Sequence, residues 1–337
     1  MTKVSLEDLQ KQVETIFRNA GVNAAQAPAI ARVIVAGERD ACKSHGIYRI
    51  EGAVRTIAAG KVKPDAVPEL DGNEGSAIVR VDAKGGFASP AFELGLPALV
   101  ERARTLGIAA LVINDCTHFA ALWPEVEAIT GEGLAALVMC PSFATVAPTG
   151  GNRPLLGTNP FAFGWPRPDE APYVFDFATS VAARGEIELH RRAGRQIPDG
   201  WAINADGNPT TDPEAALAGA MLPFGGHKGS AIATMIELLA GIMIGDLTSP
   251  EVLSQLGTTT LAPQHGELIV AMSPEAFSAG RPGSPFARAE TLFDAILGQG
   301  ARLPSQRRFV ARRLSEEEGV DLTAAEIEQL DRLCGRG

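Results

Sequence analysis

This chain of 337 residues has few cysteines, only short apolar runs and a polar N-terminus. The four cysteines are scattered and form no CxxC pair, which favours reduced thiols in a cytoplasmic protein over a disulfide framework. The first ten residues, MTKVSLEDLQ, are polar, so we expect no signal peptide. The longest apolar run, residues 231–244, is too short to cross about 30 Å of hydrocarbon as a helix. It predicts a buried core helix and no membrane span.

Positive charge is also in deficit, with 30 Lys and Arg against 40 Asp and Glu and a formal net charge of −10. This balance disfavours non-specific binding to nucleic acid or to an anionic membrane. Charged residues make up 21% and hydrophobic residues 45%, which excludes disorder, collagen and coiled coil for the chain as a whole. At roughly 150 residues per domain, the length predicts about two domains.

The usual motifs for nucleotides, metals and a nucleophilic serine are missing. No Walker A sequence and no GxSxG elbow occur, and the match to GxGxxG/A at residues 131–136 follows a predicted helix and precedes a predicted strand. A dinucleotide-binding turn needs the opposite order, strand and then helix. The five histidines have no paired spacing and neither HExxH nor CxxC is present, so we expect no metal site.

Periodicity and capping residues predict helices at both ends of the chain and alternating strands and helices between them. Expected helices cover residues 6–20, 28–41, 50–59, 89–107 and 124–130, and Thr323 with Glu326 forms a capping box for the last one. Expected strands cover residues 76–82, 108–113, 134–140, 173–177 and 267–272. Strands interleaved with helices indicate an α/β fold. The helical ends suggest that both termini build one domain and the middle builds another.

Two segments carry histidine where a proton could be exchanged. Ser44, His45 and Gly46 follow a predicted helix, with Arg49 four residues after His45. Imidazole can give or take a proton near neutral pH, and Arg can hold a carboxylate through two parallel hydrogen bonds. The alternative is a surface His and Arg at a helix boundary. Residues 118–123 follow a predicted strand, where ligands of α/β sheets bind, or form a loop with a packed Trp.

Two further segments could bind anions. Residues 223–230, PFGGHKGS, place three glycines with His227 and Lys228 at the start of a predicted helix. Backbone N–H groups and the helix dipole attract phosphate there, and the alternative is a tight turn without a ligand. Five arginines lie within residues 302–313. In a chain of negative net charge they indicate either a phosphate-binding segment or a solvated helix face.

Seven segments carry a recognisable pattern: ACKSHGIYRIEG (41–52), THFAALWPEVE (117–127), LLGTNPFAFGWP (155–166), FDFATS (175–180), ARGEI (183–187), PFGGHKG (223–229) and ARLPSQRR (301–308). Together they resemble the malate/L-lactate dehydrogenase-like oxidoreductases, which bind NAD(P) without a Rossmann fold. Within that family they are most similar to the Δ1-piperideine-2-carboxylate/Δ1-pyrroline-2-carboxylate reductases. The resemblance implies a mixed-sheet, non-Rossmann NAD(P)-binding α/β domain at residues 114–286. Residues 1–113 and 287–337 would form a discontinuous, helix-rich substrate and dimerisation domain.

The resemblance also implies roles for individual residues. His45 would be the proton donor and Ser44 and Glu186 its relay residues, while the substrate contacts would be Arg49, Thr158, Arg184 and Gly185. The cofactor contacts would be His118, Phe119, Ala120, Ala121, Leu122, Asp176, Phe177, Ala178, His227, Lys228, Arg302, Leu303, Pro304, Ser305, Gln306, Arg307 and Arg308. Ser305 and Gln306 stand where the family commonly has Gly and an acidic residue.

The implied reaction is the NADPH-dependent reduction of cyclic imino acids by a homodimeric cytoplasmic enzyme. Δ1-Piperideine-2-carboxylate would give L-pipecolate, and Δ1-pyrroline-2-carboxylate would give L-proline. A hydride would attack the C=N carbon while Arg49 anchors the carboxylate and His45 protonates the nitrogen. A carboxylate at Glu186 is expected to raise the pKa of His45, and the arginines at 302–308 favour NADPH over NADH.

Two alternatives remain open at this point. One is an NAD(P)-dependent 2-hydroxyacid dehydrogenase of the malate, lactate or ureidoglycolate type on the same scaffold, in which His45 would act on an alcohol oxygen. The other is a catalytically silent homologue that binds a ligand without turning it over.

Overall fold

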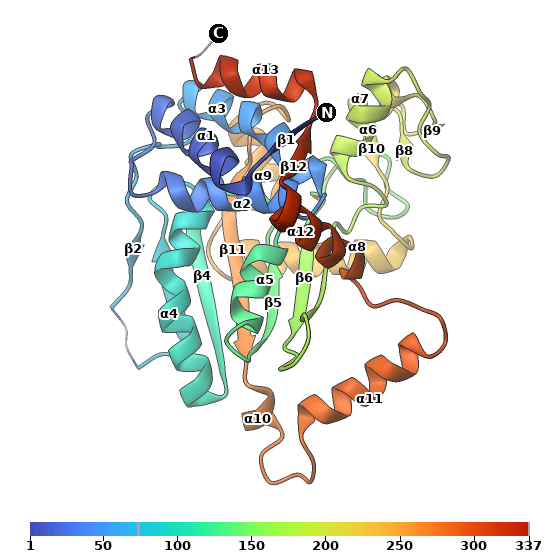
Figure 1. Cartoon of the computed structure of the whole chain (residues 1–337). Helices are drawn as coiled ribbons and strands as arrows, with labels where there is room; N and C mark the ends of the chain where they lie inside the picture. The colour runs from blue at the N-terminus through green and yellow to red at the C-terminus, as the bar shows by residue number, and fades with distance from the viewer. Residues whose placement is uncertain (73–74, 336–337) are drawn as a thin grey trace.

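A mixed seven-stranded β-sheet forms the centre of the computed structural model, which describes residues 1–72 and 75–335 (Figure 1). The strands, in spatial order, are β2 (Glu69–Leu70), β3 (Ile78–Asp82), β4 (Ile108–Thr117), β11 (Gln264–Met272), β5 (Ala135–Met139), β6 (Phe161–Trp165) and β7 (Tyr173–Phe177). Among the strand pairs of this sheet in the described chain, β3–β4 is parallel and the others are antiparallel. The sheet is therefore mixed, as the resemblance implied, and differs from the parallel sheet of a Rossmann fold.

The remaining elements surround this sheet. The α-helices are α1 (Leu6–Asn19), α2 (Ala27–Arg39), α3 (Ile50–Ala58), α4 (Ala88–Leu106), α5 (Trp123–Thr130), α6 (Arg184–Arg192), α7 (Pro213–Ala218), α8 (His227–Ile236), α9 (Ser249–Leu256), α10 (Pro274–Phe277), α11 (Pro285–Leu297), α12 (Gln306–Glu318) and α13 (Ala324–Leu333). Two 3₁₀ turns cover Lys43–His45 and Ile47–Arg49, and a π-helical turn covers Glu237–Ile242. The smaller strands are β1 (Thr2–Val4), β8 (Ala202–Ile203), β9 (Pro209–Thr210), β10 (Ala220–Met221) and β12 (Val320–Leu322).

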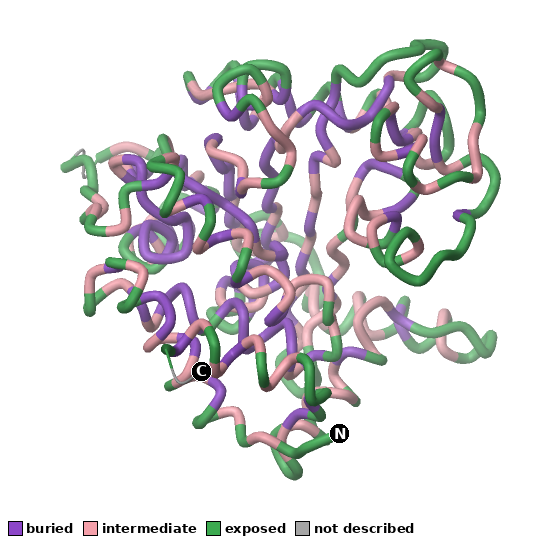
Figure 2. Tube along the Cα trace, turned by 90° about the horizontal axis from the view of Figure 1, so that it is seen from above, coloured by how far each residue is buried: buried purple, intermediate pink, exposed green. Residues whose placement is uncertain are grey.

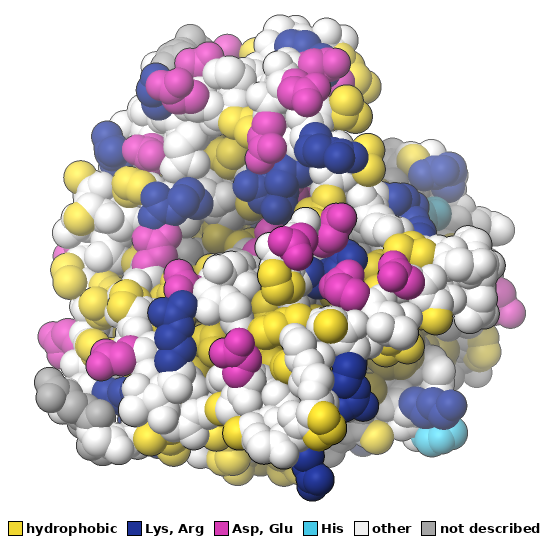
Figure 3. All heavy atoms as spheres, turned by 60° about the horizontal axis from the view of Figure 1, so that its bottom comes forward, with side chains coloured by type: hydrophobic (Ala, Val, Ile, Leu, Met, Phe, Trp, Pro, Cys, Tyr) yellow, Lys and Arg dark blue, Asp and Glu magenta, His cyan; other side chains and the backbone are white. Residues whose placement is uncertain are grey.

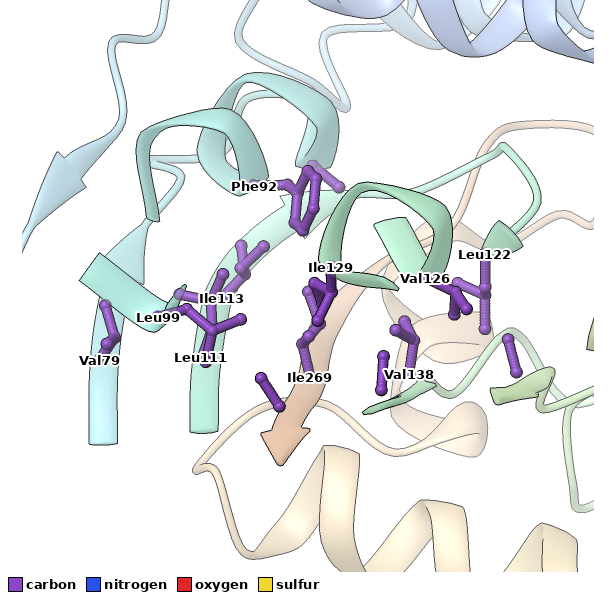
Figure 4. Close-up of a cluster of buried hydrophobic side chains, with 14 of the residues drawn as sticks. Val79, Phe92, Leu99, Leu111, Ile113, Leu122, Val126, Ile129, Val138 and Ile269 are labelled. Carbon is purple, nitrogen blue, oxygen red and sulfur yellow. The ribbon is translucent and has the colours of Figure 1, made fainter. Parts of the chain in front are cut away.

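Helices cover both faces of the central sheet. On one face, α4 and α5 pack over Leu111 and Ile113 of β4 (Figure 4). On the other face, α8 and the π-helical turn contact the intervening Val112. Successive side chains of a strand point to opposite faces, so a strand covered on both sides needs apolar residues at consecutive positions. Buried residues lie in the interior of the molecule, in this sheet with its helices and also among the helices of the two chain ends, whereas exposed segments lie at the periphery (Figure 2).

The two ends of the chain pack against each other, side by side above the sheet in Figure 1. β1 pairs antiparallel with β12, and α1, α2 and α3 share an apolar core with α13. The division predicted after residue 113 falls inside β4. This strand joins segments from both sides of the division in one sheet. The assignment of two separate domains therefore stays a prediction.

Local sequence signals located many elements. The capping box of Thr323 and Glu326 is present at the start of α13. α5 ends at Thr130 and β5 begins at Ala135, so the glycines between them form a helix-to-strand turn, as expected, and no dinucleotide-binding turn. The strand predicted at residues 108–113 continues to Thr117. This extension carries the chain directly into the segment that begins with His118.

The apolar run at residues 231–244 is helical, but the prediction of a buried core helix is wrong. Ile236 and Ala240 are buried against the sheet, whereas Leu238, Ile242 and Met243 are 51%, 60% and 59% exposed. A helix on the outside of a sheet buries only one stripe, so an apolar run of this length leaves a second stripe facing outward. Within the described residues, no helix is both long enough and apolar enough to cross a membrane.

A cleft of about 1300 Å³ lies between α2, α4, α5 and the loop that joins β6 to β7. The residues that line it do not include His45, Arg49 or Asp176. The cleft is therefore separate from the site that the sequence predicts.

On the face of the molecule shown in Figure 3, acidic and basic side chains are intermixed rather than segregated by sign.

Candidate active site

The His45 loop, residues 40–49, is held in place by a buried carboxylate. Glu38, near the end of α2, is only 3% exposed. Its Oε1 accepts a hydrogen bond from the N–H of Ile47 at 2.8 Å, and its other oxygen pairs with the ammonium group of Lys43. The loop is therefore tied to α2 both before and after His45.

Gly46, next to His45, has no room for a side chain. A Cβ here would lie 2.0 Å from Oε1 of Glu38, whereas a Cβ at Gly52 would meet nothing within 4 Å. We expect Gly46→Ala to displace Glu38 from Ile47 and to lower the free energy of unfolding by about 1–3 kcal/mol. Gly52→Ala, inside α3, is the control and should be neutral or stabilising. Urea denaturation of both variants checks this, and equal stability of the two would contradict it.

His45 lies between Ser44, Arg49 and Trp123. Its Nδ1 is 3.1 Å from Oγ of Ser44, and its ring meets the Trp123 ring edge-on at a centroid distance of 6.0 Å. Nε of Arg49 donates a hydrogen bond to the carbonyl oxygen of Ser44 at 2.7 Å. Burial, aided by the nearby charge of Arg49, lowers the pKa of His45 to about 3. His45 is therefore neutral at physiological pH in the free protein.

Glu186 does not raise the pKa of His45, so this expectation is wrong for the free protein. Glu186 lies in the first turn of α6 and is exposed. The pKa of His45 follows from burial and from Arg49, both of which disfavour the imidazolium form. A carboxylate in open solvent is screened by water and exerts little effect on a buried ring.

The start of α6 nevertheless borders the His45 loop. The Arg49 guanidinium lies 5.8 Å from the centroid of the Tyr48 ring, and a Cβ on Gly185 would contact the edge of the same ring at 3.9 Å. Arg184 donates a hydrogen bond to Oγ1 of Thr259 at 3.0 Å. The predicted substrate residues Arg49 and Gly185 thus lie against one aromatic ring, whereas Nη2 of the neighbouring Arg184 is engaged by Thr259 and the Leu217 carbonyl oxygen.

Asp176 joins the end of β7 to the loop that follows β4. Its Oδ2 accepts hydrogen bonds from the N–H groups of Leu122 and Trp123 at 2.8 and 3.1 Å. Burial raises the pKa of Asp176 to about 6, although these two hydrogen bonds favour the ionised form. The predicted cofactor segments 118–122 and 176–178 are therefore brought together, and Trp123 connects them to the His45 loop.

The N-terminus of α8 lies next to the same end of β7. The Phe177 and Phe224 rings meet edge-on with centroids 5.7 Å apart. The two glycines before the helix have φ of 55° and 59°, a left-handed conformation that glycine adopts without steric cost. His227 and Lys228 are exposed in the first turn of the helix. The N–H groups of Lys228, Gly229 and Ser230 already donate to carbonyl oxygens of residues 224–226. The exposed side chains of His227 and Lys228, with the positive end of the helix dipole, are therefore the groups that suit an anionic ligand here.

Thr158 lies in a loop that is fastened to both β7 and α8. Its carbonyl oxygen accepts hydrogen bonds from the N–H and the Oγ1 hydroxyl of Thr179 at 2.8 and 3.0 Å. The next residue, Asn159, is fully buried and donates through Nδ2 to Ala233 at 3.1 Å and to Glu237 at 2.7 Å. This predicted substrate contact is thereby fixed between the two elements.

Residues 302–308 lie against β7. Oγ of Ser305 donates a hydrogen bond to the carbonyl oxygen of Val174 at 2.7 Å. The φ of Ser305 is 64°, in the left-handed region that favours glycine. The left-handed backbone explains why the family commonly has glycine at this position. In this chain Ser305 adopts that conformation instead. Leu303 is buried, whereas Arg302 and Arg307 are exposed.

Two of the five arginines belong to an internal ion-pair cluster. Arg308 and Arg312 both pair with Asp40 and Glu127, at 2.9 Å for Arg308 to Asp40 and 2.6 Å for Arg312 to Asp40. Burial opposes ionisation of Asp40, but hydrogen bonds from Arg312 and Arg39 outweigh it and lower its pKa to about 2. These two arginines are therefore neither a solvated helix face nor unpaired charges available to a phosphate.

Most of the residues predicted for the site gather around the ends of β4 and β7. Direct contacts link the His45 loop, residues 118–123, Asp176 and the segment 302–308. The sequence motifs assign no role to Glu38, which holds the loop, or to Glu125 and Glu267, which lie in one buried cluster with His118. No motif joins these acidic residues because they lie on elements that are distant along the chain.

Comparison with known proteins gives a consistent result. Residues 4–331 match the family described as malate/L-lactate dehydrogenase. The chain is 76% identical over 336 residues to a Δ1-pyrroline-2-carboxylate reductase of Agrobacterium fabrum, covering 100% of this chain and 97% of the relative. It is 54% identical over 325 residues to a Δ1-pyrroline-2-carboxylate/Δ1-piperideine-2-carboxylate reductase of Pseudomonas aeruginosa, covering 96% and 97%. The crystal structure of a Δ1-piperideine-2-carboxylate reductase from Pseudomonas syringae pv. tomato superposes with a TM-score of 0.93 at 40% identity, covering 99% and 100%.

Proposed function

Because this chain belongs to the malate/L-lactate dehydrogenase family, we propose that it is an NADPH-dependent reductase of cyclic imino acids. Its products would be L-proline from Δ1-pyrroline-2-carboxylate and L-pipecolate from Δ1-piperideine-2-carboxylate. Membership of the family makes it an oxidoreductase with a nicotinamide cofactor, and its relatives at 76% and 54% identity are named as reductases of these imines. The observation that carries the proposal is the half-buried turn in which Nε of Arg49 donates to the Ser44 carbonyl oxygen beside His45.

The exposed groups around β7 fit a nicotinamide dinucleotide. The N-terminus of α8 carries the exposed side chains of His227 and Lys228, and Arg302 and Arg307 are exposed on the neighbouring segment. Phosphate groups are stabilised by the positive end of a helix dipole and by guanidinium forks. When bound, the reduced nicotinamide would supply the hydride that adds to the C=N carbon.

Arg49 is the group we propose for the substrate carboxylate. Nε of Arg49 is engaged with Ser44, which fixes the plane of the guanidinium and leaves its other N–H donors for a ligand. Arg49 is half-buried, and burial lowers its pKa, so its charge is only partly hydrated. A bound carboxylate supplies the missing counter-charge and the missing hydrogen bonds.

His45 is the group we propose for the proton that the imine nitrogen takes up. In the free protein burial and the charge of Arg49 hold its pKa at about 3. A substrate carboxylate paired with Arg49 would cancel part of that charge, so the pKa of His45 would rise when the substrate binds. Ser44 holds Nδ1, which leaves Nε2 for the substrate. As the hydride adds to the imine carbon, the C=N π electrons would move to the nitrogen, which would take the proton from His45 and become the amine nitrogen.

A substrate panel tests this function. We expect NADPH oxidation with either cyclic imino acid to proceed with kcat/KM at least about 100-fold above that for pyruvate or oxaloacetate, because the relatives at 76% and 54% identity are named as reductases of these imines. A higher kcat/KM with the 2-oxoacids would identify a 2-hydroxyacid dehydrogenase instead. Binding of NADPH without turnover of any of these compounds would identify a silent homologue.

Arg307 is expected to favour NADPH over NADH, since it is the exposed arginine of the segment at the start of α12. Loss of a charge-assisted hydrogen bond costs about 1.5–3 kcal/mol. Arg307→Ala should therefore lower kcat/KM for NADPH by about 10- to 100-fold and leave the value for NADH within about twofold. Arg313→Ala, also exposed on α12, is the matched control. An unchanged NADPH/NADH ratio in Arg307→Ala would remove this residue from the discrimination.

A further inference from the structure

His118, Glu125 and Glu267 form a buried cluster next to the candidate site. They come from the end of β4, the first turn of α5 and the middle of β11, and their side chains are 5%, 2% and 0% exposed. Nε2 of His118 lies 4.0 Å from Oε1 of Glu125 and 3.9 Å from Oε1 of Glu267. One donor-type atom from each residue lies within 4.8 Å of the other two. The separations from Nε2 are too long for hydrogen bonds.

Four atoms of this cluster have no hydrogen-bond partner among the residues that the structure describes: Nε2 of His118, Oε2 of Glu125 and both carboxylate oxygens of Glu267. Each unsatisfied buried polar group costs about 1–3 kcal/mol, and a charged group costs more. The imidazole of His118 is thus a deeply buried side chain whose free nitrogen faces two carboxylates. The described side chains leave this concentration of polar atoms unsatisfied.

We propose that these three side chains bind one divalent cation. An ion at about 2.0–2.2 Å from each of two donors spans up to roughly 4.0–4.4 Å between them. The observed separations of 3.9 and 4.0 Å from Nε2 of His118 to the two carboxylates are within this span. If each separation shortened by about 0.5 Å, the donor atoms would have the spacing of a tetrahedral site. Two carboxylates and a neutral imidazole carry two negative charges, which a divalent cation neutralises in this buried cluster, where Glu125 also lines the cleft between α2, α4 and α5.

Without a cation, the cluster can hold its charge only at high cost. Burial, with repulsion from Glu267, raises the pKa of Glu125 well above its usual value, and burial raises the pKa of Glu267 to about 8. Burial and the neighbouring His265 lower the pKa of His118 to about 3, so its imidazole is neutral. The competing occupants are therefore protons on the carboxyl groups, together with a buried water.

The donor set indicates the class of ion. One imidazole nitrogen with two carboxylates suits a first-row ion such as Zn²⁺ or Mn²⁺, whereas Ca²⁺ takes six to eight oxygen ligands. A bound ion would tie β4, α5 and β11 together and would fix the chain at His118, the first residue of the segment 118–122. The inference stands apart from the reaction proposed above, since it concerns binding of an ion and not turnover.

Metal analysis of the full-length protein tests this site. After expression with added Zn²⁺ or Mn²⁺ and gel filtration, we expect about one ion per wild-type chain. Glu267→Gln keeps the shape of the side chain and removes its charge, and should lower the metal content at least about fivefold. Glu275→Gln, an exposed glutamate of α10, is the matched control and should keep the ion. Exhaustive chelation should lower the thermal midpoint of the wild type by about 5 °C or more, with recovery when the ion is added back.

Metal-free wild-type protein would overturn the proposal. This result requires less than about 0.1 ion per chain after purification and no uptake of Zn²⁺ or Mn²⁺ on incubation, and it holds however the variants fold. Protons and water would then fill the cluster. In that case Glu267→Gln, which removes a buried titratable group, would be at least as stable as the wild type, and chelators would leave the thermal midpoint unchanged.

Discussion

Replacing His45 by alanine is expected to lower kcat for reduction of a cyclic imino acid by about 10²- to 10⁴-fold, the contribution of a positioned general acid. The imine nitrogen must gain a proton as the hydride adds, and His45 is the imidazole beside Arg49 whose Nδ1 lies 3.1 Å from Oγ of Ser44. We propose that it becomes protonated when the substrate carboxylate pairs with Arg49, so without it the nitrogen would depend on a proton from water. Steady-state kinetics with saturating NADPH measures the loss.

The pH dependence separates this role from a structural one. An acid must be protonated to act, so wild-type kcat should fall as pH rises through the pKa of His45 in the substrate complex. That value should lie above the pKa of about 3 in the free protein, because the bound carboxylate offsets Arg49, which after burial is the second cause of the low pKa. His45→Ala should lose this alkaline limb, and added imidazole should restore part of the rate.

Two controls accompany the His45 variant. Affinity for NADPH should remain within about threefold of wild type, since an interaction made only with the imine leaves cofactor binding unchanged. His190→Ala removes an imidazole from α6 whose Nδ1 bonds to the backbone carbonyl oxygen of Glu186 within its own helix, and should leave kcat near wild type. His45→Ala with near-wild-type kcat would refute the assignment of the proton donor.

Replacing Arg49 by lysine is expected to raise KM for Δ1-pyrroline-2-carboxylate by about 10- to 100-fold, equivalent to one or two charge-assisted hydrogen bonds. Lysine keeps the positive charge but loses the planar fork that matches a carboxylate, and it loses the Nε bond to Ser44. The change in kcat should be smaller, less than about tenfold, because the anchor binds substrate and transition state alike.

A substrate without a carboxylate supplies the decisive comparison for Arg49. Wild-type protein should prefer Δ1-pyrroline-2-carboxylate over unsubstituted 1-pyrroline, and Arg49→Lys should lose most of that preference. Arg55→Lys, an exposed position on α3, is the matched control and should keep it. If Arg49→Lys slows both compounds by the same factor, the residue supports the fold of the loop and is not the carboxylate anchor.

Several parts of the fold could be predicted from the sequence because they depend on neighbours along the chain. β7 begins and ends where its apolar pattern indicated, and the capping box of Thr323 fixes the start of α13. The order of strand and helix around Gly131 and Gly133 excluded a Rossmann turn, and the mixed sheet agrees with that exclusion. The apolar run at 231–244 showed the limit of such patterns, because hydrophobicity does not reveal which stripe of a helix meets the sheet.

By itself, the sequence determined the family, the α/β class and the identity of the chemical groups, through motifs that carry His45, Arg49, Asp176 and the glycines before His227. Only the tertiary structure decided which charges are available. It left Glu186 exposed, paired Arg308 and Arg312 with buried acids, and placed two glutamates against His118. The physical reason is that a charge acts according to its burial and its distance from other charges. Both quantities are set by contacts between segments far apart in the chain.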